Sequence, residues 1–146
     1  QGLLMWLISA PLLGAQYNGK EGGLGWLDWM GLLIWIIGIT FEAGGDFQLA
    51  RFKANPGNRG RVLDTGFWRL TRHPNYFGDV AVWWGFGCLS LAAGNYLPVL
   101  GSLAMTLLII KVSGVALLEK SLNNTKPQYK EYIRKTSAFI PWLTKK

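Results

Sequence analysis

The feature that most constrains this chain is a long segment without charge. From residue 80 to residue 110 the sequence contains no Lys, Arg, Asp or Glu. About 20 such residues are enough to cross a bilayer as a helix. Only 16% of the chain is charged, whereas soluble domains have roughly 25%. The sequence therefore predicts an integral membrane protein.

The uncharged segment is too long for one span, and GNYLP at residues 94–98 divides it, because Gly, Asn and Pro together mark a turn. Two more apolar segments precede it. We predict an all-α polytopic membrane helix bundle with about four transmembrane helices, at residues 2–16, 24–41, 76–93 and 96–118. A short amphipathic helix with Tyr129 and Tyr132 follows near the C-terminus. Small residues such as Gly85 and Gly87 allow close packing within the chain or between chains, so the oligomeric state stays open.

The distribution of basic residues predicts how this arrangement is oriented in the membrane. Of the 15 Lys and Arg, six lie in residues 51–72 and seven in residues 120–146. Two predicted spans separate these regions, so both fall on one side of the membrane. Because cytoplasmic segments carry an excess of Lys and Arg, we predict that the 51–72 loop and the C-terminus are cytoplasmic. The net charge of +7 follows from this topology, and we expect no nucleic-acid binding.

The chain opens directly on an apolar segment, QGLLMWLISAPLLG, without the charged start of a signal peptide. We expect a single membrane domain over residues 1–146 that forms the C-terminal part of a longer protein. Residues 1–23 would be a truncated first span with its loop, and residues 24–142 a cofactor-binding region. With one Cys and one His, an internal disulfide is impossible and we expect no metal site.

An acidic stripe lies where the second span ends, in TFEAGGDFQLARFK. Glu42, Asp46, Leu49 and Lys53 are spaced i, i+4, i+7 and i+11, which places them on one helical face. The Gly-Gly pair between the two carboxylates leaves room for close approach of another group. The alternative is an interfacial helix end with solvated charges, although acidic groups at membrane depth more often line a site.

A basic loop follows at residues 54–68, where Asn-Pro and Pro-Gly dipeptides mark turns. It carries Arg59, Arg61 and Asp64. A Gly-rich backbone with arginines suits a phosphate-bearing ligand, because guanidinium makes bidentate charge-assisted bonds. Any cytoplasmic loop can have the same composition, so the loop alone does not identify a site.

A polar cluster, TRHPNYFGD at residues 71–79, opens the third predicted span. It holds Arg72, His73, Asn75, Tyr76 and Asp79, and burying such groups is costly unless something satisfies them. With the acidic stripe and the basic loop, the cluster predicts a pocket at the cytoplasmic membrane face for a large polar-headed cofactor, with an apolar substrate arriving from the lipid. The alternatives are that Arg72 and His73 extend toward the headgroups or cap the span, and that Asn75 is only a cap.

Three sequence blocks resemble the steroid 5α-reductase superfamily, most closely its bacterial-type branch of uncharacterised multispan proteins. The blocks are FEAGGDFQLARFKANPGN, GFWRLTRHPNYFGDVAVWWG and LLEKSL…KPQYKEYIRKTSAFIPWL, and the resemblance covers roughly residues 31–142. It implies an NADPH site in which Lys53 and Arg61 face phosphate and Trp68 packs on the cofactor. Carried over position by position, the cofactor-binding residues would be Glu42, Asp46, Leu49, Lys53, Arg61, Trp68, Arg72, His73, Asn75, Tyr76, Asp79, Glu119 and Tyr132.

The resemblance implies hydride transfer from NADPH to an activated double bond of a steroid or other lipid enone, in the bacterial inner membrane. It places the carbonyl-polarising Glu and Tyr in spans that precede this chain, so no catalytic residue is assigned. Two alternatives stay open. RHPNY is shared with isoprenylcysteine carboxyl methyltransferases, which use S-adenosylmethionine. A truncated, non-catalytic relative would also keep the fold.

Overall fold

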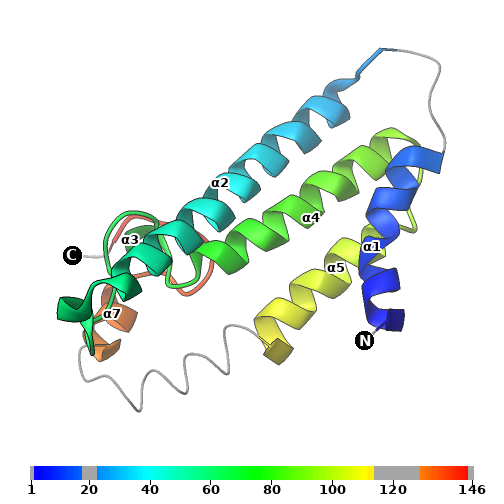
Figure 1. Ribbon diagram of the computed structural model, residues 1–146. Coiled ribbons are helices and arrows are strands. Elements are labelled where there is room, and N and C mark those ends of the chain that lie inside the picture. The colour runs from blue at the N-terminus through cyan, green and yellow to red at the C-terminus, as the bar shows by residue number, and fades with distance from the viewer. Residues whose placement is uncertain (1, 18–22, 114–128, 145–146) are drawn as a thin grey trace. The chain divides into compact units, whose positions relative to one another are not determined.

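The computed structural model describes residues 2–17, 23–113 and 129–144. Over these ranges the chain is helical and contains no β-strand beyond one isolated parallel bridge between Thr71 and Ser137. The helices are α1 (Gly2–Tyr17), α2 (Trp26–Ala54), the 3-10 turn η1 (Pro56–Asn58), α3 (Phe67–Leu70), α4 (Pro74–Ala92), α5 (Val99–Leu107), the π-helical η2 (Leu108–Ser113) and α7 (Tyr129–Lys135) (Figure 1). The predicted all-α class is confirmed.

Each predicted span falls on a helix, although the helix of the second span, α2, continues well beyond residue 41. The first matches α1 and the third matches α4. Residues 93–98 form the predicted turn, with Gly94 at a φ of 83° that favours glycine. The fourth begins as α5 and becomes a π-helix at Leu108, and its end at residues 114–118 lies outside the described residues.

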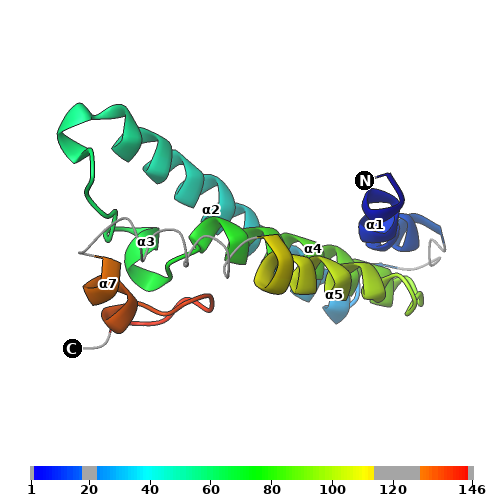
Figure 2. The ribbon, with the colours of Figure 1, turned by 90° about the horizontal axis from the view of Figure 1, so that it is seen from below.

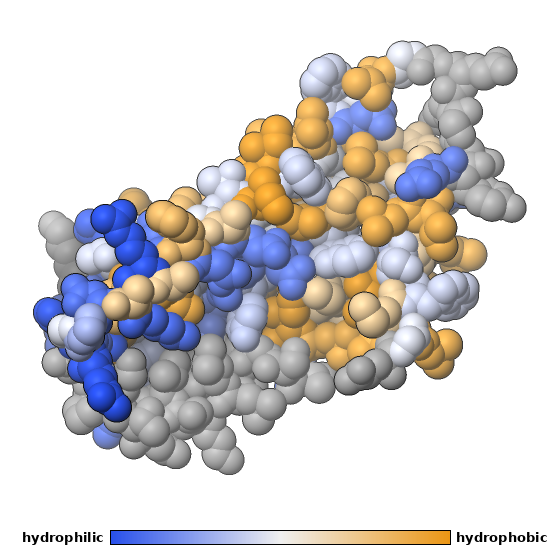
Figure 3. Space-filling view, viewed as in Figure 1, coloured by the Kyte–Doolittle hydropathy of each residue, from blue (hydrophilic) through white to orange (hydrophobic). Residues whose placement is uncertain are grey.

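Helix α2 combines the second predicted span and the acidic stripe in one continuous helix. Within the described ranges it is the helix that is both long and apolar enough to cross a membrane, and residues 2–16 and 99–111 form shorter apolar helices. Only 11% of its apolar window is buried. Figure 3 shows hydrophobic residues over its first half. Large apolar side chains that face outward are typical of a helix surrounded by lipid rather than of the core of a soluble domain.

The chain divides into two compact units. The first contains residues 1–39 and 79–108, and the second contains residues 40–78 and 109–146. In the first unit α1 packs against α5, as two views show (Figures 1 and 2). A Cβ on Gly31 would lie 2.9 Å from the carbonyl oxygen of Gly85, so α2 and α4 touch backbone to backbone there. Small residues permit this close packing between apolar helices.

In the second unit, the segment after α7 runs alongside residues 70–72. The Arg72 N–H donates to Ser137 O at 2.9 Å, and the Trp142 N–H donates to Leu70 O at 2.9 Å. The Thr71 hydroxyl donates to Phe139 O at 2.9 Å. An aromatic cluster supports the contact, because Phe77 lies 6.1 Å from Phe139 between ring centroids. These bonds bring the C-terminal segment next to α3, from which it is far in sequence (Figures 1 and 2).

Candidate functional site

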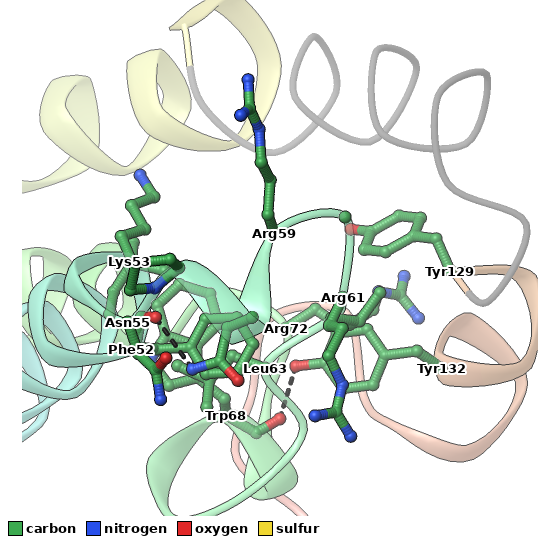
Figure 4. A pocket seen from close by; sticks show the side chains of 15 residues that line it. Phe52, Lys53, Asn55, Arg59, Arg61, Leu63, Trp68, Arg72, Tyr129 and Tyr132 are labelled. Atoms are coloured by element: carbon green, nitrogen blue, oxygen red, sulfur yellow. Dashed lines mark hydrogen bonds between the residues drawn. The ribbon is translucent and has the colours of Figure 1, made fainter.

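The second unit contains a pocket of about 530 Å³. This volume lies within the roughly 300–1,000 Å³ of small-molecule and cofactor sites. Its walls come from the end of α2, the loop after it, the start of the polar cluster and α7 (Figure 4). The lining residues are Leu49, Phe52, Lys53, Asn55, Pro56, Asn58, Arg59, Gly60, Arg61, Val62, Leu63, Trp68, Arg72, Tyr129 and Tyr132.

Local hydrogen bonds shape the basic loop that forms one side of this pocket. The Asn55 side chain caps the 3-10 turn by accepting the Gly57 N–H at 2.9 Å. The Asn58 amide donates to Phe52 O at 2.9 Å, and the Arg61 N–H donates to Asn58 O at 3.0 Å. The loop is thereby tied to the last turn of α2. Its two arginines, at positions 59 and 61, both line the pocket.

Trp68 forms the buried side of the pocket and is held at both ends. Its indole N–H donates to Gly45 O at 3.0 Å. Its own carbonyl oxygen accepts a hydrogen bond from the Tyr132 hydroxyl. Gly45 allows this arrangement, because a Cβ there would lie 3.1 Å from Pro74 Cγ and 3.2 Å from Asn75 N. The predicted close approach at the Gly-Gly pair is confirmed.

Arg72 reaches the pocket from within the protein. It is only 7% exposed, and its Nη1 donates to Ile133 O at 2.9 Å and to Thr136 O at 2.8 Å. The guanidinium therefore binds the carbonyl end of α7, where a cation is also favoured by the helix dipole. The idea that Arg72 extends toward lipid headgroups is wrong, because its side chain is buried and bonded to the backbone.

The electrostatic character of the pocket is cationic. Lys53, Arg59, Arg61 and Arg72 line it, and within residues 2–17, 23–113 and 129–144 no acidic residue does. Burial, more than any other cause, raises the pKa of the Tyr132 hydroxyl, and the neighbouring Tyr129 raises it further. Tyr132 therefore stays protonated and keeps its hydrogen bond to Trp68. Several cations beside aromatic and aliphatic surface match the chemistry of a ligand with both phosphate groups and flat rings.

Six of the residues predicted from the sequence line this pocket, namely Leu49, Lys53, Arg61, Trp68, Arg72 and Tyr132. Asp46 and Asn75 lie outside its lining but meet one another, since the Asn75 amide donates to the Asp46 carboxylate at 2.9 Å. This hydrogen bond therefore links the start of α4 to α2.

The remaining predicted residues are distributed differently. His73 is 1% exposed and stacks on Tyr76, with ring centroids 5.6 Å apart, so its extension toward headgroups is also wrong. Glu42 is half-buried on α2. Asp79 belongs to the first unit, where its carboxylate hydrogen-bonds Trp83 one turn along α4. Glu119 lies outside the described residues.

Several lining residues were not predicted as site residues, among them Phe52, Asn55, Leu63 and Tyr129. Arg59 belonged to the predicted basic loop but was not singled out. The sequence carries a signal for Tyr129, because it lies three residues before Tyr132 and therefore on the same face of a helix. Phe52 and Leu63 are ordinary apolar residues, and only the folded loop brings them to the pocket.

Comparison with known proteins connects this chain to a family. The chain is 26% identical to an uncharacterized protein of Schizosaccharomyces pombe over 98% of its length, and it spans 47% of that protein. It is 30% identical to the Delta(14)-sterol reductase of the same organism over 66% of its length, which is 26% of the reductase. The chain thus spans about half of the first relative and a quarter of the second. No solved structure matches it.

The family model described as "Protein of unknown function (DUF1295)" matches residues 1–136, which is nearly the whole chain. The chain belongs to this family, which is part of the steroid 5α-reductase-like group.

Proposed function

We propose that the protein is an NADPH-dependent membrane reductase that transfers hydride to an activated C=C bond of a sterol, steroid or other lipid enone. The observation that carries this proposal is the pocket of about 530 Å³ that four cationic and four aromatic side chains line. The similarity to a Delta(14)-sterol reductase supports a lipid acceptor.

The residues of the pocket fit the parts of NADPH by their chemistry. Lys53, Arg59 and Arg61 would bind its phosphate groups through charge-assisted hydrogen bonds. Trp68, Tyr129 and Tyr132 offer flat apolar surface for its rings. When bound, this cofactor supplies the hydride, and the protein supplies binding, orientation and exclusion of water. Arg72, already bonded to two carbonyls, would hold α7 as a wall of the site.

The same lining argues against S-adenosylmethionine, the cofactor of the methyltransferase alternative. That molecule carries a sulfonium cation, which four nearby cationic side chains repel, and among the described residues the lining contains no carboxylate to offset them. A non-catalytic relative remains the third candidate, and cofactor binding with turnover separates it from a reductase.

The proposal includes the membrane arrangement. We infer that the protein belongs to the bacterial-type branch of the group and forms a bundle of about four spans in the bacterial inner membrane. The 51–72 loop and the C-terminus would lie on the cytoplasmic side. The exposed apolar side chains of α2 and the concentration of basic residues in the second unit support it.

The first test is a titration of the full chain in detergent with NADPH, NADH and S-adenosylmethionine, followed by quenching of its eight Trp. We expect saturable quenching by NADPH. Arg61→Ala should weaken it about tenfold, because a charge-assisted hydrogen bond contributes roughly 1.5 kcal/mol or more. The matched control is Arg69→Ala, an exposed arginine that does not line the pocket.

Two outcomes would contradict the proposal. One is saturable binding of S-adenosylmethionine without binding of NADPH. The other is an equal loss of NADPH affinity in Arg61→Ala and Arg69→Ala, since a general charge effect would then explain both. Turnover is tested by loss of NADPH absorbance after addition of a 3-oxo-4-ene steroid or a Delta(14)-sterol to the bilayer-reconstituted chain.

A further inference from the structure

Large apolar side chains after α7 are exposed in the part of the chain that the structure describes. Ile140 is 67% exposed, Trp142 71% and Leu143 79%. We call these three residues the C-terminal apolar cluster. They lie outside the lining of the pocket, so the proposed cofactor site does not account for them.

The exposure of the cluster is imposed by how its backbone is held. Thr71 and Leu70 bond the backbone of Phe139 and Trp142, and the Phe139 ring packs toward Phe77. The segment is thus anchored through its backbone and one inward ring. The cluster is consequently fixed on the outer side.

The residues around the cluster indicate what covers it. Arg134 and Lys135 are exposed at the end of α7, and Lys145 and Lys146 follow the cluster in the sequence. Trp beside apolar residues, flanked by Lys and Arg, is typical of a segment that lies in a membrane interface and binds anionic headgroups. The chain itself contains a candidate membrane span, because α2 is long and apolar enough to cross a bilayer.

We infer that the C-terminal apolar cluster inserts into the membrane interface and that the exposed cations Arg134 and Lys135 bind anionic lipid headgroups. The partner is the lipid surface itself, and the contact holds the segment that carries the Tyr129 and Tyr132 wall against the membrane. This inference does not depend on reductase activity or on the identity of the cofactor.

The test uses spin labels on the full chain in nanodiscs of phosphatidylcholine and phosphatidylserine. Cys88→Ala removes the chain's one cysteine, and Leu143→Cys, Lys130→Cys or Leu33→Cys then adds a single labelling site. Leu33 is an apolar residue of α2 that is 58% exposed, and its label identifies preparations in which the span is in lipid. Lys130 is exposed on α7 and is the matched water-facing control.

In those preparations we expect the label at residue 143 to be accessible to oxygen and protected from a water-soluble nickel chelate. The ratio of oxygen accessibility to chelate accessibility should be several-fold higher at residue 143 than at residue 130. Equal access of the chelate to both labels would overturn the inference, because the cluster would then face water. Protection of residue 143 from both reagents would also overturn it, because protein rather than lipid would cover the cluster.

A charge test addresses the headgroup contact. The double variant Arg134→Glu, Lys135→Glu should move the residue 143 label toward water in nanodiscs with phosphatidylserine and much less in phosphatidylcholine alone. The same shift in both lipids would refute binding to anionic headgroups.

Discussion

Replacement of Arg72 by Ala tests whether a buried guanidinium holds one wall of the pocket. Its Nη1 atom donates to two carbonyl oxygens at the end of α7, at 2.9 and 2.8 Å. Arg72→Ala leaves both oxygens without this donor. A hydrogen bond to a charged group contributes about 1.5–3 kcal/mol, and two bonds from one group are not additive. Together they give an expected loss of about 3 kcal/mol in the local stability of the segment.

Amide hydrogen exchange over residues 129–144 measures this loss, with the protein in detergent or nanodiscs. Since 1.4 kcal/mol corresponds to a factor of ten, exchange in this segment should accelerate about 100-fold. Arg72→Lys should give an intermediate effect, because an ammonium keeps the charge but not the planar fork. The control Arg69→Ala, at the exposed position of α3, should change stability by no more than about 0.5 kcal/mol.

Unchanged exchange over residues 129–144 in Arg72→Ala would refute the reasoning. So would an equal acceleration in residues 26–39, because the variant would then unfold the chain as a whole instead of releasing one segment. Only a local acceleration identifies Arg72 as the residue that positions α7.

Four further predictions concern single contacts. Gly45→Ala should lower the thermal unfolding temperature by an amount equivalent to about 1–3 kcal/mol, since its Cβ would lie 3.1 Å from Pro74 Cγ, whereas Gly23→Ala, with open space around it, should not. Asp46→Ala should cost less than about 1 kcal/mol, because its bond with Asn75 is exposed to solvent, and a loss as large as that of Arg72→Ala would contradict this ranking. Burial raises the pKa of Tyr132 above its usual value of 10.0, so its contribution to stability is complete below about pH 10 and is lost above it. Alkaline unfolding should therefore be steeper in the parent chain than in Tyr132→Phe, and identical pH profiles would disprove this role. Trp84→Phe removes the hydrogen bond to the Thr106 hydroxyl at 3.0 Å and should cost about 1 kcal/mol in unfolding experiments, with Trp26→Phe, a highly exposed Trp, as the neutral control.

The helices were predictable because their signals are local. The limits of α1 and α4 follow from apolar runs, and the turn at residues 94–98 follows from its Gly, Asn and Pro. The spacing of the acidic stripe predicted that helix α2 continues beyond its apolar half, and it does so to Ala54. The ends of the fourth predicted span were less accurate. It was predicted to start at residue 96, whereas α5 starts at Val99, three residues later. Nothing in its composition signals a π-helix at Leu108.

The pocket was predictable only in part. Lys53, Arg61 and Trp68 carry motif signals and do line it. Asp46 and Asn75 carry signals of the same kind, yet their side chains bond to each other outside its lining. A sequence indicates which polar groups need a partner, but it cannot show whether that partner is a ligand or another residue.

The sequence by itself determined the helical class, the apolar segments and the concentration of cations around the 51–72 loop, because hydropathy and charge act residue by residue. Tertiary structure decided which groups meet. It joined Arg72 to the carbonyls at the end of α7, and Tyr132 to Trp68. The Arg72–Thr136 and Tyr132–Trp68 hydrogen bonds each connect residues 64 positions apart in the sequence. It also turned Ile140, Trp142 and Leu143 outward. Such contacts depend on chain geometry between distant segments, which no local pattern of residues encodes.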